Sequence, residues 1–528
     1  MASDLRRRGG RRRRGPAHRA GSRGHCGDGG RGMTPLVTLP MLLPLLAAAV
    51  SIGFGSFRIV QRLISVVTLS GTATISAFLL SRVDREGQVV VQVGGWSAPI
   101  GITLVADRLA AIMLLVASLM LLAVLLFAIG QPGAETHHTG FHPVYLILAS
   151  GIALAFLTGD LFNLFVAFEV TLMASYVLIT LGGRADQVRS GMTYVVISLL
   201  ASNLFLLALA FIYAATGTVN LADLSSRIAD LPDGLRSGLA VLLIVVFGVK
   251  AAIFPLFFWL PDSYPTAPTP VTAVFAGLLT KVGVYAIIRS QTLLFPPDTQ
   301  PGNLLLVVAG LTMVVGVFGA ITQNDIKRIL SFHIVSQIGY MIMGLGLFTL
   351  AGLAGAVFYI IHHIVVKTTL FLVAGLVEQR AGTGQLARLS GLARFEPTLA
   401  VLFLVPALSL AGIPPFSGFV AKLALIGAGI GAGQYVIVAV SLVVSLLTLF
   451  SMIKIWSNAF WGLMGVGDAP LARAASRRSR ALMTGSTVAL AGLSMAIVLW
   501  AGPLYALSER TAQDLMDTRP YVDTVLGS

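Results

Sequence analysis

Charged residues and cysteine are both scarce in this sequence. Only 11% of the 528 residues are Asp, Glu, Lys or Arg, against about 25% in an average soluble domain, so an ordinary water-soluble protein is excluded. Cys26 is the single cysteine, which excludes a disulfide within the chain. Apolar residues are abundant, at 56%, and the mean hydropathy is +0.88. A disordered chain, which combines low hydrophobicity with high charge, is therefore excluded too, and a polytopic helical membrane protein is indicated.

The net charge of +14 is unevenly spread along the chain. Residues 1–32 hold ten arginines and two acids, Asp4 and Asp28, and so carry eight of these positive charges. The remaining excess is small, so the charge gives little reason to expect a nucleic-acid partner. No apolar stretch directly follows the arginines, as it would in a secretory signal. Two interpretations stay open: an Arg-rich disordered extension, or a mis-assigned start with Met33 as the true first residue, which we favour.

Long apolar runs recur along the rest of the chain. A membrane-spanning helix needs about 20 mostly apolar residues, and this pattern predicts an all-α polytopic membrane protein with about fourteen transmembrane helices. The connections are short, so we expect no soluble domain. The expected helices are 35–55, 60–81, 109–130, 142–158, 161–182, 191–216, 238–260, 267–290, 303–322, 327–348, 351–377, 398–425, 434–460 and 482–503.

Lysine and arginine are more frequent in the connections after odd-numbered expected helices than in the others. The positive-inside rule then places those connections in the cytoplasm and both termini on the outer side of the cell membrane. In this orientation the arginines of residues 1–32 would have to cross the membrane. That conflict is the physical argument for translation starting at Met33.

A weak internal repeat divides the expected helices into groups. Three matches, in the same order and at similar offsets, predict two inverted five-helix repeats with broken helices, a plan found in many transporters. The repeats are helices 4–8 (142–290) and 9–13 (303–460), flanked by 33–141 with the first three helices and 461–528 with the last helix and tail. The matches pair 250–256 with 410–416, 203–208 with 369–374, and Asp160 with Asp325.

Ionisable side chains stand inside several apolar segments, where a charge is costly and indicates a functional site by default. Glu169 and Lys250 lie in the middle of two of these segments. An ion pair between them would keep both charged, and its geometry could control proton release. A static structural salt bridge is the alternative.

The next segments continue the series with basic groups. Lys281 lies eight residues before Arg289, about 12 Å along a helix, which is deep for a lysine that reaches back to the interface. His363 and Lys367 are four residues apart and so share one helix face, and a histidine titrates near neutral pH. Helix packing is the alternative role for His363.

Prolines interrupt two of the segments that carry these lysines. Pro414 and Pro415 precede Lys422, and Pro255 follows Lys250. Proline breaks a helix and frees backbone carbonyls, which is tolerated at membrane depth only in protein or beside a wet cavity. A lysine beside such a break is a good candidate for an ion path.

Other ionisable residues in apolar segments have weaker claims. His333, with serines nearby, is a possible member of the path, whereas His362 points away from His363 and is expected to pack. Lys454 is expected to reach the interface, and Lys327 and Arg328 to be interfacial charges. No metal cage, phosphate-binding loop or nucleophilic triad is visible, so we expect no cofactor, no metal and no enzymatic activity of the chain itself.

Six motifs in helices 4–13 resemble the antiporter-like proton-translocating subunits of respiratory complex I, membrane-bound hydrogenases and Mrp cation/proton antiporters. The stretch 263–286 is similar, more narrowly, to the D subunit of Mrp-type multisubunit Na⁺/H⁺ antiporters. The chain lacks the lateral helix of the largest complex I relative. The motifs lie at 168–170, 249–262, 267–273, 325–331, 367–375 and 411–419.

The resemblance implies a role for each residue of the series. Glu169 would be the switch acid that partners Lys250, and Lys281 the bridging lysine. His363 and Lys367 would link two half-channels, and Lys422 would be the terminal lysine. Tyr359 stands where complex I relatives often have a second histidine, which puts the connecting path in doubt.

The function implied is proton translocation along this relay, coupled to cation export in a multisubunit Na⁺/H⁺ antiporter. The partners would be other subunits of a hetero-oligomeric membrane complex, protons, Na⁺ and the lipid bilayer. The alternative is a proton-pumping membrane subunit of an NADH-quinone oxidoreductase or a membrane-bound hydrogenase, whose redox centres would lie in other subunits.

Overall fold

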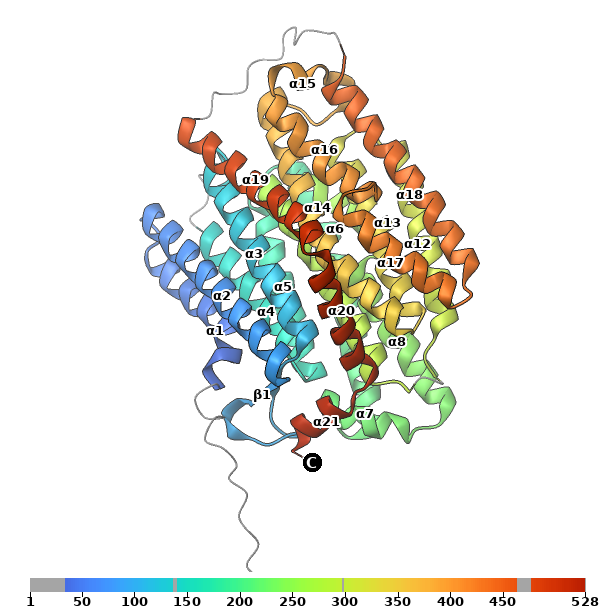
Figure 1. The fold of residues 1–528 in the computed structure, drawn as a ribbon. Helices are drawn as coiled ribbons and strands as arrows, with labels where there is room; N and C mark the ends of the chain where they lie inside the picture. Colours follow the sequence, from blue (N-terminus) through green and yellow to red (C-terminus); the bar gives the residue numbers. More distant parts are fainter. Residues whose placement is uncertain (1–33, 136–139, 297–298, 463–475, 528) are drawn as a thin grey trace, which may run out of the picture.

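The computed structural model describes residues 34–135, 140–296, 299–462 and 476–527. The arginine-rich residues 1–32 and Met33 lie outside this range. The described chain folds into a bundle of long helices that run between two ends of the molecule (Figure 1). It is an all-α polytopic membrane protein, as the sequence predicts.

The bounds of the elements are as follows. The first part contains α1 (Thr34–Gly53), α2 (Arg58–Glu86), β1 (Val89–Gln92), β2 (Thr103–Ala106), α3 (Arg108–Gly130), α4 (Phe141–Leu157), α5 (Leu161–Thr180) and α6 (Ala185–Thr216). It is followed by α7 (Leu221–Ala229), α8 (Asp233–Ala251), α9 (Trp259–Ser263), α10 (Thr269–Val274), the π-helical η3 (Phe275–Leu279) and α11 (Thr280–Leu293).

The second half begins with α12 (Gly302–Thr322), α13 (Ile326–Gly346), α14 (Leu350–Ala381), α15 (Leu392–Phe395), α16 (Pro397–Ala411) and α17 (Ser417–Gly431). It ends with α18 (Tyr435–Ile455), the π-helical η5 (Trp456–Phe460), α19 (Arg477–Leu499), α20 (Ala501–Met516) and α21 (Arg519–Leu526). Three short 3₁₀ turns are η1 (Val93–Gly95), η2 (Tyr264–Thr266) and η4 (Leu386–Arg388).

Twelve helices in the described ranges are long and apolar enough to cross a membrane. The expected segment 142–158 forms α4, which has only 17 residues, and the expected segment 398–425 forms the two shorter helices α16 and α17. The count of fourteen transmembrane helices therefore stays a prediction.

Two of the expected helices are interrupted. α8 ends at Ala251, where Ala252 takes a left-handed conformation (φ 59°), and non-helical chain with Pro255 precedes α9. α16 ends at Ala411, where Gly412 is left-handed (φ 83°), and α17 begins after Pro415. Proline has no N–H and clashes with the preceding turn, so neither helix can run through its break. A third interruption, the π-helical η3, has no such signal in the sequence.

The two halves share one local pattern at opposite ends of the bundle. Asp160 caps α5 by accepting a bond from Asn163 N–H at 2.8 Å, and pairs with Asn220 just before α7. Asp325 caps α13 in the same way at 3.1 Å and pairs with Gln385 shortly before α15. α7 and α15 lie at opposite ends (Figure 1). Inverted repeats would produce this arrangement; the repeats themselves stay a prediction.

The polar connections contain elements that the sequence analysis did not predict. β1 and β2 form an antiparallel hairpin between α2 and α3. α7 lies after α6 as a short amphipathic helix that buries Leu221, Leu224 and Ile228 and is capped by Asn220. Its three-to-four-residue apolar spacing was a readable signal. The chain after α19 continues as α20 and α21 rather than as a plain tail.

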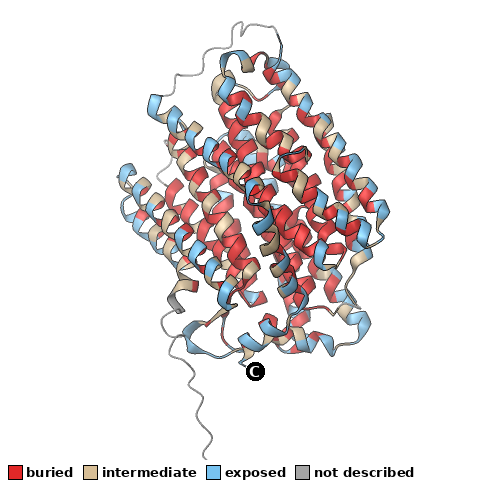
Figure 2. Cartoon of the chain, viewed as in Figure 1, coloured by how far each residue is buried: buried red, intermediate tan, exposed pale blue. Residues whose placement is uncertain are grey.

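Burial increases from the rim of the bundle to its centre. Figure 2 shows buried residues along the central helices and exposed ones on the outer faces. The apolar windows of α10–α11 and α14 are completely buried, whereas only 28% of that in α1 is buried. The helices that carry Lys281, His363 and Lys367 are therefore the most enclosed part of the protein.

Candidate functional site

Glu169 and Lys250 do not form the direct ion pair that the sequence led us to expect. The Lys250 ammonium, at the end of α8, donates to the Ser198 carbonyl at 3.3 Å and to the Ser202 hydroxyl at 3.4 Å, both on α6. It lies 5.8 Å from the centroid of the Phe168 ring, next to Glu169. One carboxylate oxygen of Glu169 is buried and has no hydrogen-bond partner in the described chain.

A small cavity lies beside Lys250. It has a volume of about 30 Å³ and is lined by residues of α5 and α6 and by Leu279 and Val282 next to Lys281. Thr171 and Tyr194 contribute hydroxyl groups to its wall. A polar cavity of this size holds a water molecule. It lies between the segment with Glu169 and the helix with Lys281.

Lys281 is fully buried at the start of α11, directly after the π-helical η3. Its ammonium donates to the Ala276 carbonyl at 2.6 Å and to the Thr280 hydroxyl at 3.1 Å. In a π-helix the backbone bonds shift to i+5, and such turns occur frequently at functional sites. The lysine therefore bonds back to a carbonyl of the irregular turn.

His363 and Lys367 lie on the completely buried α14. The Lys367 ammonium donates to the Leu330 carbonyl of α13 at 2.9 Å. His363 stacks on Tyr359 with ring centroids 6.3 Å apart. Both ring nitrogens of His363 are buried without a hydrogen-bond partner in the chain as described. Buried polar atoms are normally satisfied by protein or water, so this imidazole suits a hydrated path better than dry packing.

Lys422, on α17, is bonded to the broken end of α16. Its ammonium donates to the Leu410 carbonyl at 3.0 Å, the Ala411 carbonyl at 3.2 Å and the Ser445 hydroxyl at 3.0 Å. It also lies 4.9 Å from the centroid of the Tyr340 ring. Both carbonyls belong to the last turn of a helix, where they have no intrahelical partner. The break of α16 thus supplies the acceptors that hold this lysine.

The helices that carry these groups form one packed series. α5 packs on α6, α6 on α8, α8 on α11, η3 on α14, and α14 on α17. Within the described residues, no lysine of the series donates to a carboxylate; the acceptors are backbone carbonyls and hydroxyls. Each amine can therefore gain or lose a proton without breaking a salt bridge. These lysines are Lys250, Lys281, Lys367 and Lys422.

Two further histidines are fully buried beside this series. Nε2 of His333 lies 2.9 Å from the Ser451 hydroxyl of α18, and Nδ1 of His362 lies 2.8 Å from the Ser417 hydroxyl of α17. The other ring nitrogen of each is buried without a partner in the portion described. Each histidine thus ties α13 or α14 to a neighbouring helix, and His333 stays a possible member of the relay.

The basic groups expected at the rim are at the ends of helices. Lys327 pairs with Glu378 at 2.6 Å, and Arg328 pairs with Asp262 at 3.1 Å. Lys454 donates to two backbone carbonyls at the C-terminal end of α12, at 2.9 and 2.7 Å. Lys454 therefore caps a helix through the carbonyls that helix ends leave without partners.

A buried polar cluster next to α2 escaped the sequence analysis. Glu135 lies 2.5 Å from the Arg62 guanidinium and 3.4 Å from His142, whose other ring nitrogen lies 3.1 Å from the Ser65 hydroxyl. Burial raises the pKa of Glu135, but His142 and Arg62 outweigh it and hold the pKa below its ordinary value. A glutamate and a histidine seven residues apart gave no warning that they would meet.

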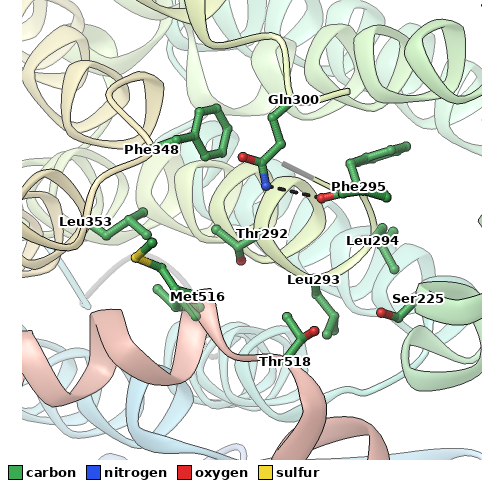
Figure 3. A pocket seen from close by; sticks show the side chains of 12 residues that line it. Ser225, Thr292, Leu293, Leu294, Phe295, Gln300, Phe348, Leu353, Met516 and Thr518 are labelled. Carbon is green, nitrogen blue, oxygen red and sulfur yellow. Dashed lines mark hydrogen bonds between the residues drawn. The ribbon is translucent and has the colours of Figure 1, made fainter. Parts of the chain in front are cut away.

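No group of three His, Cys, Asp or Glu side chains that could hold a metal ion occurs in the ranges described. A cavity of about 290 Å³ lies instead at one end of the bundle, between α11, α14 and α20 (Figure 3). Its walls include Thr292, Gln300, Leu353 and Met516, and none of its lining side chains is charged. It therefore offers room but no titratable group.

The chain is similar to known proteins over most of its length. A family model described as NADH:quinone oxidoreductase/Mrp antiporter, transmembrane, matches residues 158–448. The D subunit of the Na⁺/H⁺ antiporter of Alkalihalophilus pseudofirmus is 45% identical over 498 residues, which are 94% of this chain and all of that protein.

Two solved structures have the same fold. A chain of the Mrp complex from Dietzia sp. DQ12-45-1b is 36% identical, with a TM-score of 0.88 over 94% of this chain and all of that chain. A chain of the membrane-bound sulfane sulfur reductase, an archaeal respiratory membrane complex, is 27% identical, with a TM-score of 0.85 over 93% of this chain and all of that one.

Proposed function

The chain belongs to the NADH:quinone oxidoreductase/Mrp antiporter family, and we propose that it is the proton-translocating D subunit of a multisubunit Na⁺/H⁺ antiporter. In this role it is a transporter component, embedded in the cell membrane and assembled with other membrane subunits. The proposal agrees with the printed function of the 45% identical relative and with the assembly named for the Dietzia structure.

One observation of the structure carries the proposal. Four buried lysines on packed helices are held by carbonyls and hydroxyls rather than by carboxylates, with His363 between them. Buried charges are usually paired, because an isolated charge is costly. A row of amines without acidic partners is poor structural design but suits proton transfer, since each amine alternates between a neutral and a charged form.

The proposed path runs from Glu169 and Lys250 through Lys281 to His363 and Lys367, and ends at Lys422. Charging one amine raises the energy of charging the next, so protons move along the series by electrostatic coupling. Moving one charge across the membrane costs about 2.3 kcal/mol per 100 mV, and the inward movement of protons would drive Na⁺ export.

The proposed orientation follows from the two ends of the bundle. The end with α15 and the connections after odd-numbered helices carries more lysine and arginine and would face the cytoplasm. The end with α7 and α21 would face outward, together with both termini. We keep translation from Met33 as part of this proposal.

Ion flux in everted vesicles tests the proposal. The whole gene cluster is expressed in an antiporter-deficient host, with the wild-type chain or with Glu169→Gln or Lys250→Ala. We expect added Na⁺ to collapse a preformed pH gradient with the wild type and to have no effect above vesicle background with either variant, because both break the relay at its first step.

Arg227→Gln is the matched control. It removes an exposed charge from α7 that pairs with Asp223 on the surface, so flux should stay at the wild-type level. Wild-type flux from both relay variants, present at equal amounts in the membrane, would contradict the relay. A wild type that ignores Na⁺ but pumps protons when NADH is oxidised would contradict the antiporter.

The alternative is the same fold driven by electron transfer, as a proton-pumping membrane subunit of a complex I-like oxidoreductase or a membrane-bound hydrogenase. The similarity to a chain of the sulfane sulfur reductase favours it. Neighbouring genes discriminate cheaply: small antiporter subunits support the first function, and NADH- or nickel-binding subunits support the second.

A further inference from the structure

Arg289 and Asp107 form a buried ion pair that the relay does not include. Arg289 lies near the end of α11 and Asp107 directly before α3, and their side chains are only 9% and 7% exposed. Asp107 also accepts a bond from the Ala110 N–H at 2.8 Å and so caps α3. Removing two charges from water often costs more than their attraction returns, so stability alone is a weak reason for this pair.

The pair continues a file of side chains that starts at the centre of the relay. Lys281, Tyr285 and Arg289 follow one another at intervals of four residues on α11, and such residues are neighbours on one helix face. The Tyr285 hydroxyl donates to the Phe156 carbonyl at 2.7 Å. The Arg289 guanidinium lies 5.6 Å from the centroid of the Tyr285 ring. The file therefore leads from Lys281 to the end of the bundle that carries α21.

A charged cavity meets the file at that end. It has a volume of about 440 Å³, and Asp107 and Tyr521 belong to its wall together with Glu86, Asp514 and Asp517. The ring centroid of Tyr521, on α21, lies 5.4 Å from the guanidinium. The arginine thus stands between two aromatic rings, at the place where the cavity ends. The uncharged cavity of Figure 3 lies at the same end, but its walls include none of the three residues of the file.

We propose that the 440 Å³ cavity is the mouth of the proton path at this end, and that the Asp107–Arg289 pair is its gate. The inference rests on the proposed function. While the pair is closed, the guanidinium, which does not lose its proton in proteins, keeps cations away from Tyr285 and Lys281, as fixed positive charges do in other selective pores.

The gate opens when the pair separates. A charged Lys281 repels Arg289 on the same helix, which weakens the pair. The proton of the Lys281 ammonium then passes through water to the Asp107 carboxylate, leaving a neutral amine and a neutral acid. Asp107 releases the proton to water in the cavity and pairs with Arg289 again. The acids of the cavity wall favour cations at the mouth.

Thiol labelling tests the gate directly. The assembled complex is used in intact cells with Cys26→Ser, which removes the only native cysteine. Tyr285→Cys is introduced with the pair intact or with Asp107→Asn and Arg289→Gln together. A membrane-impermeant methanethiosulfonate is added from outside. We expect the second protein to react about ten-fold faster, because an open gate exposes position 285. Thr524→Cys, in the cavity wall, should react in both backgrounds.

The controls separate the gate from a general loosening of the fold. Arg510→Gln removes the Asp84–Arg510 pair at the same end of the bundle and should not accelerate labelling at 285. If the double variant does not accumulate, Asp107→Asn alone decides, since asparagine still caps α3. Unchanged labelling at 285 in every background, or no labelling of Thr524→Cys from outside, overturns the gate. Labelling needs no Na⁺, so failure of the antiport assay would overturn the proposed function separately.

Discussion

Buried amines in this protein are held by oxygens that carry no formal charge. Lys281 and Lys422 each bond to carbonyls that irregular helix geometry makes available, at η3 and at the end of α16. A carbonyl accepts a bond from a charged ammonium and from a neutral amine, whereas a carboxylate would favour the charged form strongly. The choice of acceptor therefore keeps each lysine able to exchange its proton.

Glu135 shows the opposite chemistry, because its carboxylate has charged and polar partners. Glu135→Gln should lower the thermal unfolding midpoint of the detergent-solubilised complex by an amount equivalent to about 1–3 kcal/mol, as Arg62 and His142 lose their partner. The folded-state pKa of Glu135 lies below its ordinary value of 4.5. Its stabilisation is thus complete above that value and is lost as the pH falls through the lower folded-state pKa.

The midpoint difference between wild type and Glu135→Gln should therefore stay constant between about pH 8 and pH 5, and shrink below about pH 4.5. Asp186→Asn is the control, because its pair with Arg184 is exposed and worth little. A difference that shrinks already between pH 8 and pH 5 would count against this account.

At the scale of elements, the relay depends on close packing around broken helices. A Cβ at Gly283, on α11, would lie 2.6 Å from the backbone nitrogen of Ala251 and 2.9 Å from its Cα. α11 therefore rests directly on the end of α8, one residue after Lys250. Glycine is required here because the opposing atoms are backbone, which cannot rotate away.

Gly283→Ala should push α11 away from the break that carries Lys250. We expect overpacking to cost about 1–3 kcal/mol of stability, and Na⁺-dependent proton flux in vesicles to slow because Lys281 is displaced. Gly238→Ala on α8 is the matched control: a Cβ there meets nothing within 4 Å, and alanine favours a helix interior by about 1 kcal/mol. Equal behaviour of the two variants would refute this interpretation of the contact.

The whole molecule has two chemically different ends. Charged side chains of α2, α3, α20 and α21 meet at one end, where Arg108 pairs with Asp84 at 3.0 Å and with Asp514 at 2.7 Å. Burial raises the pKa of Asp514 despite Arg108 beside it. This network ties the last helices of the chain to the first ones, and it closes the bundle around the cavity assigned above as a mouth.

The orientation of these ends can be measured with single cysteines in a Cys26→Ser background. Ser226→Cys on α7 and Ala387→Cys in η4 are exposed positions at opposite ends. We expect an impermeant thiol reagent to label position 226 in intact cells, and position 387 only after permeabilisation, because the end with more lysine and arginine stays in the cytoplasm. The reverse pattern would overturn the proposed orientation.

The class of the protein and the membership of the charged series can both be predicted from short stretches of sequence. Runs of apolar residues require helices in lipid, and a charge inside such a run is conspicuous wherever its neighbours lie. The prolines at 255 and 415 likewise marked the two breaks, because their effect is local. These inferences need only residues close together in the chain.

Which buried groups meet is settled by tertiary packing instead. Lys250 bonds to α6 rather than to Glu169, η3 opens beside Lys281, and Glu135 finds Arg62, 73 residues away. Arg289 and Asp107 are 182 residues apart. Such pairings depend on the rotation and depth of each helix after packing. Hydropathy defines only that a segment is buried, and it is the packing of whole helices that selects the partner of each buried group.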